Sequence, residues 1–315
     1  MVYPRIGSKI EYLTNDRDKT DIQNLAFGQV IQIMKTEFVN VYQEYGLPRG
    51  NAGAGFVSAW IPDVPKTVSG SRKRPAVLIL PGGGYSHTSE REAEPVALRL
   101  VARGYAAFVL HYSCAPSSFP VPLREAALAM RFIRENSQRF SVDASMVAAM
   151  GFSAGGHLCG TLGAMYDCPE VADIGPAQLL RPDVLGLCYP VAVSWGETHR
   201  ESFENISAGD PELKKRLSLD RLVRSDMPPV FLWHTRNDSS VPCRNSLLLA
   251  AALEANGVDF AMHIYRRGQH GLSTADENVY PVGGVPKISR DVPGWLDAAI
   301  NFFEETGLRI TDLEA

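Results

Sequence analysis

One segment of the chain places a serine where it can act as a nucleophile. The sequence GFSAG at residues 151–155 follows the apolar run Val147–Met150 and precedes a segment of helical character. A serine between a strand and a helix takes a tight, strained turn, and glycines two residues before and after it leave the space that this turn needs. The turn exposes the hydroxyl close to the positive end of the following helix. The pattern favours Ser153 as a catalytic nucleophile over a serine in an ordinary turn.

A glycine-rich segment lies upstream, with the sequence PGGGY at residues 81–85 after the apolar run Ala76–Leu80. Acyl transfer needs amide donors aimed at the oxyanion of its tetrahedral intermediate, and glycine lets the backbone approach the acyl group because it has no Cβ. The segment matches neither phosphate-binding fingerprint, G-x-x-x-x-G-K-[ST] or G-x-G-x-x-G. We therefore expect an oxyanion hole made by the amides of Gly83, Gly84 and Ala154.

The serine needs a base, and His270 is the best candidate among the seven histidines. It lies between glycines in the sequence RGQHG, in a loop after the last apolar run. His157 is four residues beyond Ser153 on the same predicted helix and points away from the position of a base. Three further histidines lie in or at the end of strand-like runs and are expected to be structural: His111, His234 and His263.

A carboxylate at the end of a strand, between the serine and the histidine in chain order, would complete a triad. Asp238 follows the run VFLWHT and meets this requirement. Three other aspartates, Asp210, Asp220 and Asp226, lie in a charged segment that is typical of a solvated surface. The chain has no H-E-x-x-H motif and no D-x-D cluster after a strand, so no metal is expected, and acyl transfer by a triad requires no cofactor.

Together these motifs resemble a known family. The sequences PGGGYSH, GFSAGGH, HTRNDSSVP and GQHG, in this order and spacing, are similar to the α/β-hydrolase esterase/lipase family. The most similar branch contains acetyl esterases, including bacterial acetyl-xylan esterases. The resemblance covers roughly residues 75–303 and implies the same triad and oxyanion donors. One position departs: related lipases begin the glycine loop with a histidine that braces it, whereas this chain has Pro81.

The elements that must position these residues alternate regularly after residue 75. Short runs are apolar throughout, as in strands buried on both faces of a parallel sheet, and segments of helical periodicity lie between them. The predicted strands are Ala76–Leu80, Tyr105–Tyr112, Val147–Met150, Val184–Tyr189, Val230–Trp233 and Phe260–Tyr265. The predicted helices are Ala93–Arg103, Leu123–Phe140, Ala154–Tyr166, Asn245–Asn256 and Val292–Glu305. We predict an α/β-hydrolase fold, with a mostly parallel central sheet flanked by helices.

The domain organisation follows from the less regular parts of the chain. Residues 1–70 are predicted to be lead-in strands and a linker of the same domain, with Val39–Tyr42 and Phe56–Ile61 as antiparallel strands. Residues 71–315 then form the catalytic domain. Residues 191–228 are rich in charge and contain no strong strand, which predicts a cap-like insertion over the carboxyl edge of the sheet.

The composition excludes several classes of protein. The 35 acidic and 31 basic side chains give a charge of −4, which argues against nucleic acid as a partner. No stretch approaches the ~20 apolar residues of a membrane span, and no basic block suggests a membrane surface. The N-terminal residues lack the pattern of a signal peptide, so the expected location is cytoplasmic. The five cysteines form no C-x-x-C pair and are expected to be reduced core thiols.

The predicted activity is that of a serine carboxylesterase acting on a small-molecule ester. The resemblance implies acetyl groups on carbohydrates such as acetylated xylo-oligosaccharides. A peptidase or an arylformamidase on the same scaffold stays open, because amide and ester acyl transfer share these motifs. A non-catalytic binding protein is disfavoured, because all three triad residues are present. Five side chains are candidates for the substrate pocket, of which Tyr85 and Trp195 are expected to close its acyl side: Tyr85, His87, Trp195, His199 and Trp233. The sequence does not give the oligomeric state.

Overall fold

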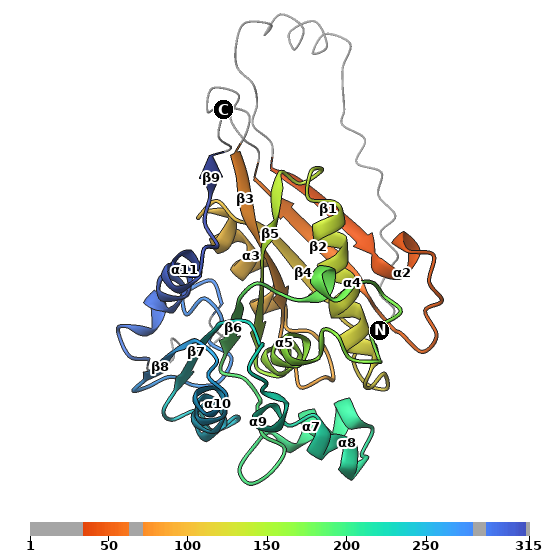
Figure 1. Cartoon of the computed structure of the whole chain (residues 1–315). Coiled ribbons are helices and arrows are strands. Elements are labelled where there is room, and N and C mark those ends of the chain that lie inside the picture. The colour runs from red at the N-terminus through yellow and green to blue at the C-terminus, as the bar shows by residue number, and fades with distance from the viewer. Residues whose placement is uncertain (1–33, 63–71, 280–287, 313–315) are drawn as a thin grey trace, which may run out of the picture. The chain divides into compact units, whose positions relative to one another are not determined.

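The computed structural model describes residues 34–62, 72–279 and 288–312 (Figure 1). All described residues belong to one compact unit within residues 34–315. The prediction that residues 1–70 and 71–315 form one domain therefore stays a prediction. In the three described stretches, no helix is long and apolar enough to cross a lipid bilayer.

A sheet with the strand order β1-β2-β4-β3-β5-β6-β7-β8 forms the centre of this unit, and the short β9 pairs with β3. The pairs β1–β2 and β2–β4 are antiparallel, whereas the strands from β4 to β8 along this order run parallel. The strands are β1 (Lys35–Asn40), β2 (Phe56–Ile61), β3 (Arg72–Leu80), β4 (Ala106–His111), β5 (Val142–Phe152), β6 (Leu185–Cys188), β7 (Val230–Thr235), β8 (Phe260–Tyr265) and β9 (Thr311–Asp312).

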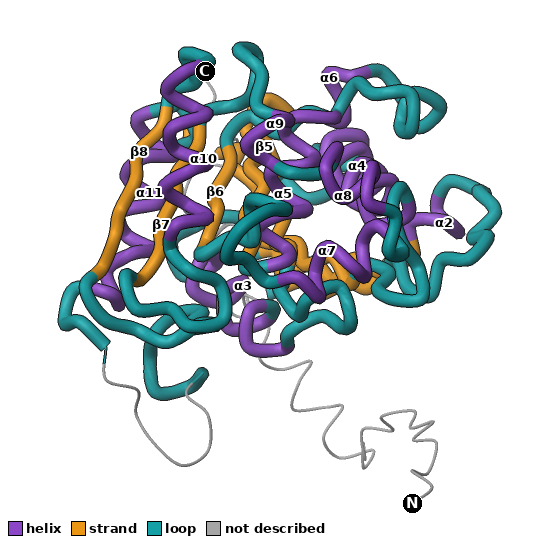
Figure 2. Tube along the Cα trace, turned by 90° about the horizontal axis from the view of Figure 1, so that it is seen from below, coloured by secondary structure: helices purple, strands orange, loops and turns teal. Residues whose placement is uncertain are grey.

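Helices cover both faces of this sheet (Figures 1 and 2). Residues of α3 and α11 pack on one face, and residues of α4, α5 and α10 pack on the other. The α-helices are α2 (Val41–Glu44), α3 (Glu94–Val101), α4 (Val121–Glu135), α5 (Ala154–Met165), α6 (Ala177–Leu180), α7 (Arg200–Ser207), α8 (Pro211–Arg216), α9 (Leu219–Leu222), α10 (Arg244–Ala255) and α11 (Trp295–Glu305). Two 3₁₀ turns are η1 (Glu90–Glu92) and η2 (Val292–Gly294).

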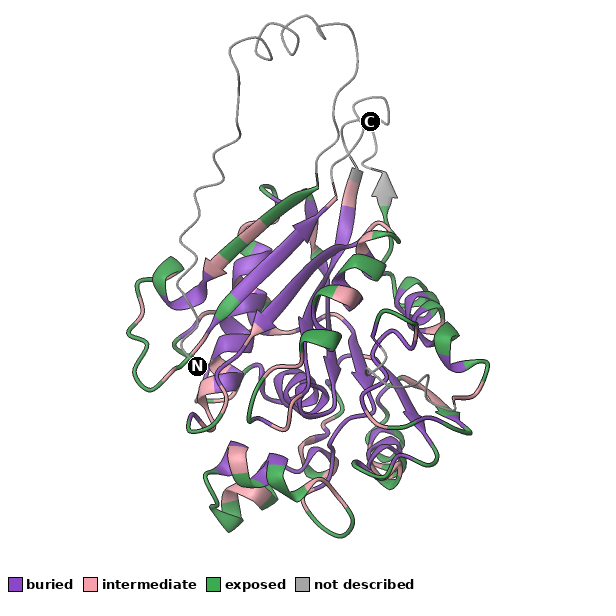
Figure 3. Cartoon of the chain, turned by 180° about the vertical axis from the view of Figure 1, so that it is seen from behind, coloured by how far each residue is buried: buried purple, intermediate pink, exposed green. Residues whose placement is uncertain are grey.

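The apolar strand runs have a direct structural cause. Successive side chains of a strand point to opposite faces, so Val77 and Ile79 join the core beneath α3 and α11, while Leu78 and Leu80 join the core beneath α4 and α5. All four are fully buried. Figure 3 shows the central strands buried along most of their length and β1 exposed at the edge of the sheet.

The predicted strands and helices after residue 75 correspond to β3–β8 and to α3, α4, α5, α10 and α11. The two predicted antiparallel strands are present as β1 and β2, and β2 has the predicted bounds Phe56–Ile61, but the first strand covers Lys35–Asn40 rather than Val39–Tyr42, because α2 begins at Val41. The side-chain oxygen of Asn40 accepts hydrogen bonds from the amides of Tyr42 and Gln43, both at 3.1 Å. This capping satisfies the first amides of α2, so the chain turns from strand to helix within the apolar run.

Between β6 and β7 the chain leaves the sheet and forms α7, α8 and α9 near the carboxyl ends of the strands (Figure 1). Of two buried contacts in this segment, the first lies within the segment itself and the second attaches it to α5. The amide of Leu219 donates to the carbonyl of Ala192 at 2.7 Å, and Nε2 of the buried His157 donates to the carbonyl of Leu217 at 2.7 Å. Residues 191–228 thus form helices at this edge, and their function as a cap stays a prediction.

Candidate active site

Ser153 lies at the sharp turn between β5 and α5. Its backbone has φ 53° and ψ −118°, a combination that residues with a Cβ rarely adopt. A Cβ on Gly151 would lie 2.1 Å from the carbonyl oxygen of Gly155, and a Cβ on Gly155 would lie 2.0 Å from the carbonyl oxygen of Leu80. The backbones approach so closely at these two positions that only glycine fits, which explains the spacing of the motif.

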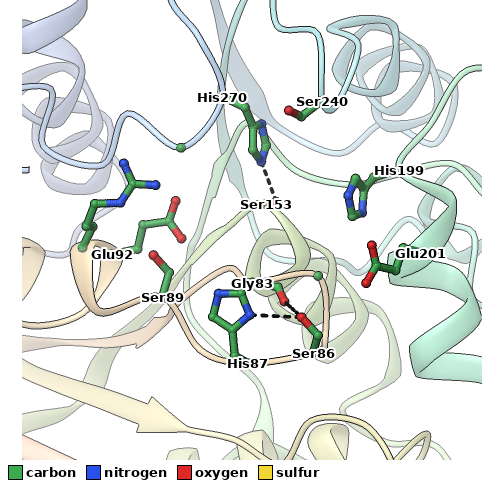
Figure 4. Close-up of a pocket in the computed structure, with 13 residues that line it drawn as sticks. Gly83, Ser86, His87, Ser89, Glu92, Ser153, His199, Glu201, Ser240 and His270 are labelled. Carbon is green, nitrogen blue, oxygen red and sulfur yellow. Dashed lines mark hydrogen bonds between the residues drawn. The ribbon is translucent and has the colours of Figure 1, made fainter. Parts of the chain in front are cut away.

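Three side chains form a hydrogen-bonded chain at this turn. Nε2 of His270 lies 2.8 Å from Oγ of Ser153 (Figure 4), and Nδ1 of His270 lies 2.6 Å from Oδ2 of Asp238. Because a carboxylate only accepts hydrogen bonds, Nδ1 carries the proton and Nε2 accepts from the serine hydroxyl. An imidazole held in this tautomer can take the serine proton during nucleophilic attack.

Asp238 is buried in the turn after β7, with 6% of its surface exposed. Its Oδ1 accepts hydrogen bonds from the amides of Ser240 and Val241, both at 2.9 Å. Burial by itself raises the pKa of this carboxyl, but the hydrogen bonds and charges of His234 and His270 outweigh burial and hold the pKa well below its ordinary value. Asp238 is therefore a carboxylate at neutral pH and keeps its acceptor role toward His270.

The glycine loop at residues 81–84 is fixed by its carbonyl groups, each of which accepts a hydrogen bond. The donors are the Tyr112 hydroxyl to Pro81 at 2.6 Å, the Ser89 amide to Gly82 at 2.9 Å, the Ser86 hydroxyl to Gly83 at 2.9 Å and Nδ2 of Asn205 to Gly84 at 2.9 Å. Within the described residues, the amides of Gly83 and Gly84 donate to no other group. The amide of Ala154 begins α5 and has no partner within that helix. These three predicted donors are thus available to a ligand.

A cavity of about 410 Å³ opens in front of Ser153 and His270. Ser86 and His87 line it next to the glycine loop, and His199 and Glu201 line it from the start of α7 (Figure 4). Nδ1 of His87 lies 3.0 Å from the Ser86 hydroxyl. These side chains give the cavity a polar wall that can exchange hydrogen bonds with a hydroxyl-rich ligand.

Two of the five predicted pocket side chains, His87 and His199, line this cavity, and the other three do not. Trp233 is fully buried, and Tyr85 is 1% exposed with its hydroxyl donating to Nδ1 of His157 at 2.8 Å. Trp195 is 43% exposed and its indole N–H donates to Asp220 at 3.0 Å, away from the cavity. The prediction that Tyr85 and Trp195 close the acyl side was therefore wrong. The backbone of Tyr85 has a positive φ of 58°, and its ring packs edge-on against Tyr112 and His157 in the core.

The sequence did not point to Arg91, Glu92 and Glu201 as lining residues. Glu92 lies in the charged segment SEREAE, which is typical of a solvated surface, yet its side chain is buried. The only feature of the sequence that could have suggested Glu92 as a lining residue is its position shortly after the glycine loop.

Metal and disulfide chemistry have no site in the part of the chain that the structure describes. In the ranges 34–62, 72–279 and 288–312, no three His, Cys, Asp or Glu side chains gather so as to hold a metal ion. All five cysteines are unpaired. Two of them, Cys159 and Cys188, are buried, and the other three are half-buried.

Two family models match the chain. The BD-FAE model matches residues 63–174, and the prolyl oligopeptidase family model matches residues 128–282. The chain is 38% identical over 219 residues to endo-1,4-beta-xylanase B of Butyrivibrio fibrisolvens, covering 66% of this chain and 34% of that protein. It is 30% identical over 230 residues to the acetylxylan esterase of Xylanibacter ruminicola, covering 70% of this chain and 45% of that protein. The chain thus spans less than half the length of these curated relatives.

A solved structure is similar over nearly its whole length. The acetyl ester-xyloside bifunctional hydrolase from Caldicellulosiruptor lactoaceticus superimposes with a TM-score of 0.73 at 34% identity. The match covers 87% of this chain and 97% of that protein. The common fold therefore extends over most of this chain.

Proposed function

Because this chain belongs to the α/β-hydrolase esterase/lipase family, in its acetyl esterase branch, we propose that it is a serine carboxylesterase that removes acetyl groups from carbohydrate esters. The observation that carries the proposal is the pair of hydrogen bonds joining Ser153 to His270 and His270 to Asp238. A glycine loop with available amides next to the serine supports the same reaction. The substrate is a small molecule such as an acetylated xylo-oligosaccharide.

The proposed reaction passes through an acyl-enzyme. Ser153 Oγ attacks the ester carbonyl while His270 takes its proton, and the oxyanion binds the amides of Gly83, Gly84 and Ala154. The tetrahedral intermediate collapses, and His270 returns the proton to the leaving alcohol. A water molecule then attacks the acyl-enzyme with His270 as base, which releases acetate and regenerates the serine. Asp238 holds the imidazole in the required tautomer and stabilises its protonated form.

A carbohydrate as the alcohol is supported by the cavity and by the relatives. His87, His199 and Glu201 offer donors and acceptors opposite the nucleophile, which suits an alcohol with several hydroxyl groups. Two of the similar proteins are named for xylan, one as a xylanase and one as an acetylxylan esterase.

The test compares acetate release from acetylated xylo-oligosaccharides with turnover of 4-nitrophenyl acetate, using Ser153→Ala as the control. We expect both substrates to be hydrolysed by the wild-type chain and neither by the variant. Turnover of 4-nitrophenyl acetate without any release of acetate from the oligosaccharides would overturn the substrate class. Retained turnover in Ser153→Ala would overturn the mechanism.

A peptidase is the second candidate, supported by the match of residues 128–282 to the prolyl oligopeptidase family. The same triad can cleave an amide bond, because both reactions proceed through an acyl-enzyme. An aminoacyl-4-nitroanilide assayed beside the acetate esters distinguishes the two. Cleavage of the anilide at a higher kcat/KM than any ester would favour the peptidase.

A further inference from the structure

Glu92 is a buried carboxylate at the wall of the catalytic cavity. Only 3% of its surface is exposed. Its Oε2 accepts a hydrogen bond from the Gly82 amide at 2.8 Å, and its Oε1 accepts one from the Tyr189 hydroxyl at 2.7 Å. A buried carboxylate is costly unless hydrogen bonds compensate it, so these two bonds determine where its oxygens lie.

The first of these bonds fixes the loop that carries the oxyanion donors. Pro81 has no N–H, so the Gly82 amide is the first donor of the loop. A Cβ on Gly82 would lie 2.7 Å from Oε2 of Glu92 and 2.9 Å from Cβ of Ser153. Gly82 is therefore packed between the carboxylate and the nucleophile, directly before the amide of Gly83.

The second bond reaches the loop that carries the base. The Tyr189 hydroxyl, which donates to Glu92, accepts a hydrogen bond from the Ser273 amide at 2.9 Å. The Tyr189 ring also packs edge-on against His270, with the ring centroids 5.1 Å apart. The Ser273 hydroxyl donates to the carbonyl of Arg91, next to Glu92 in the chain. Glu92 and Tyr189 thus connect the glycine loop to the segment from His270 to Ser273.

The backbone along this connection is strained. Tyr189 has φ 37° and Ser273 has φ 52°, and Ser153 itself has φ 53°. Residues with a Cβ keep such conformations only when their surroundings hold them, and such strain gathers at functional sites. The hydrogen bonds of Glu92 and Tyr189 are contacts that hold this part of the site.

We propose that Glu92 is a positioning residue for the esterase reaction. Through Gly82 and Tyr189 it fixes the oxyanion loop and the His270 loop relative to each other. This inference rests on the proposed function, since it concerns the geometry of that reaction. A purely structural carboxylate would change the stability of the fold without changing how well the site binds a tetrahedral adduct.

The test uses Glu92→Ala, Glu92→Gln and Tyr189→Phe, with Glu125→Gln as a matched control. Glu125 is also fully buried and accepts from a tyrosine hydroxyl, that of Tyr42 at 3.0 Å, and from the Ser113 amide at 2.6 Å, but it does not line the cavity. We measure kcat and KM with 4-nitrophenyl acetate, the thermal midpoint, and the inhibition constant of a trifluoromethyl ketone. The ketone forms a tetrahedral adduct with a serine hydroxyl, whose oxyanion occupies the oxyanion hole.

We expect Glu92→Ala to lower kcat by about 100-fold, as for loss of one oxyanion donor, with KM within about threefold. The inhibition constant of the ketone should rise by a similar factor. Glu92→Gln should lose less, because its amide oxygen can still accept from Gly82. Tyr189→Phe should lose activity in the same way, and the double variant Glu92→Gln/Tyr189→Phe should lose less than the product of the two single effects, because both changes break one connection.

Three outcomes would overturn the inference. One is a folded Glu92→Ala variant whose kcat and ketone affinity lie within threefold of wild type. If Glu92→Ala does not fold, the same result in both Glu92→Gln and Tyr189→Phe counts equally. Another is a lowered kcat with unchanged ketone affinity. The third is an equal loss in Glu125→Gln. Failure of the proposed function is distinct, because the wild-type chain would then show no Ser153-dependent ester turnover.

Discussion

Nε2 of His234 lies 3.3 Å from Oδ2 of Asp238, the same oxygen that accepts the hydrogen bond from His270 at 2.6 Å. His234 is fully buried, and its Nδ1 lies 2.7 Å from the Ser246 hydroxyl. The carboxylate therefore faces two imidazoles, one from the end of β7 and one from the loop after β8. Both favour its ionised form, which is the form that the proposed mechanism requires.

Replacement of this carboxylate should abolish most activity. Asp238→Asn replaces a carboxylate, which only accepts hydrogen bonds, with an amide that can also donate to Nδ1 of His270. The imidazole is then no longer held with its proton on Nδ1, so we expect kcat to fall by about 10⁴-fold. The control is Asp226→Asn, since Asp226 is exposed and pairs with Arg224 outside the cavity. Steady-state kinetics of both variants decide the point. A large loss in Asp226→Asn with a small loss in Asp238→Asn would mean that a different carboxylate completes the triad.

Replacements of Ser153, the proposed nucleophile, should reveal the strain of its turn. Ser153→Ala should lower kcat by about 10⁶-fold with little change in thermal midpoint. Ser153→Gly should be equally inactive, yet about 1 kcal/mol more stable than the alanine variant, because glycine accepts φ 53° without strain. This corresponds to a midpoint about 2 °C higher. At an unstrained position an alanine variant is more stable than a glycine variant. A higher thermal midpoint in Ser153→Ala than in Ser153→Gly would therefore contradict the strained turn.

The stability of the fold should depend on His157 in mild acid. Burial lowers the pKa of His157 to about 4, against the opposing effect of its hydrogen bond to Leu217. Between pH 6.5 and about 4 the unfolded chain binds a proton that the folded chain does not, so stability falls as the pH falls through this window. The contribution lost by pH 5 is about 2 kcal/mol.

The measurement is the thermal midpoint from pH 7.5 to 4.5 for the wild type, His157→Gln and a control, His87→Gln. His87 is exposed, so its replacement should leave the slope unchanged. We expect a shallower slope in His157→Gln alone. An equal dependence of the midpoint on pH in the wild type and His157→Gln would contradict the prediction. It would show that this imidazole takes up its proton at the same pH in the folded and the unfolded chain.

The polar wall of the cavity should decide which alcohol is accepted. Glu201→Gln should lower kcat/KM for acetylated xylo-oligosaccharides by about 10-fold, the loss of a hydrogen bond to a charged group, and leave 4-nitrophenyl acetate unaffected. The matched control is Glu212→Gln, on α8 and exposed outside the cavity. An equal loss on both substrates would place the effect of Glu201 on the acyl transfer itself rather than on recognition of the alcohol.

The sequence predicted those parts of the site that local sterics and chain order determine. Glycine is required on both sides of Ser153, because a Cβ added at either position would lie less than 2.2 Å from a backbone oxygen. The spacing of these glycines is therefore visible in any sequence that makes this turn. Asp238 and His270 follow strands whose apolar runs are unmistakable, and parallel strands bring their carboxyl ends to one edge.

The remaining parts depend on tertiary packing that the sequence pattern does not contain. Tyr85 follows the glycine loop and is expected near the acyl group, but its ring packs against Tyr112 and His157 in the core. Glu92 has the composition of a surface residue, and only the fold brings Gly82 and Tyr189 to its two oxygens. A charged side chain is predicted to be exposed unless its partners are known, and one of these partners, Tyr189, lies far from Glu92 in the sequence.

The hydrogen bond from Asn205 of α7 to the carbonyl of Gly84 has a consequence for protein engineering. The helix that begins beside Glu201 also supports the loop with the proposed oxyanion donors. Exchanging α7 for the corresponding segment of another esterase, in order to change the alcohol that is accepted, would alter the rate of bond cleavage as well as selectivity. A chimaera that keeps an asparagine at position 205 should retain turnover, and random libraries for new substrates should therefore vary residues 199 and 201 while leaving this amide in place.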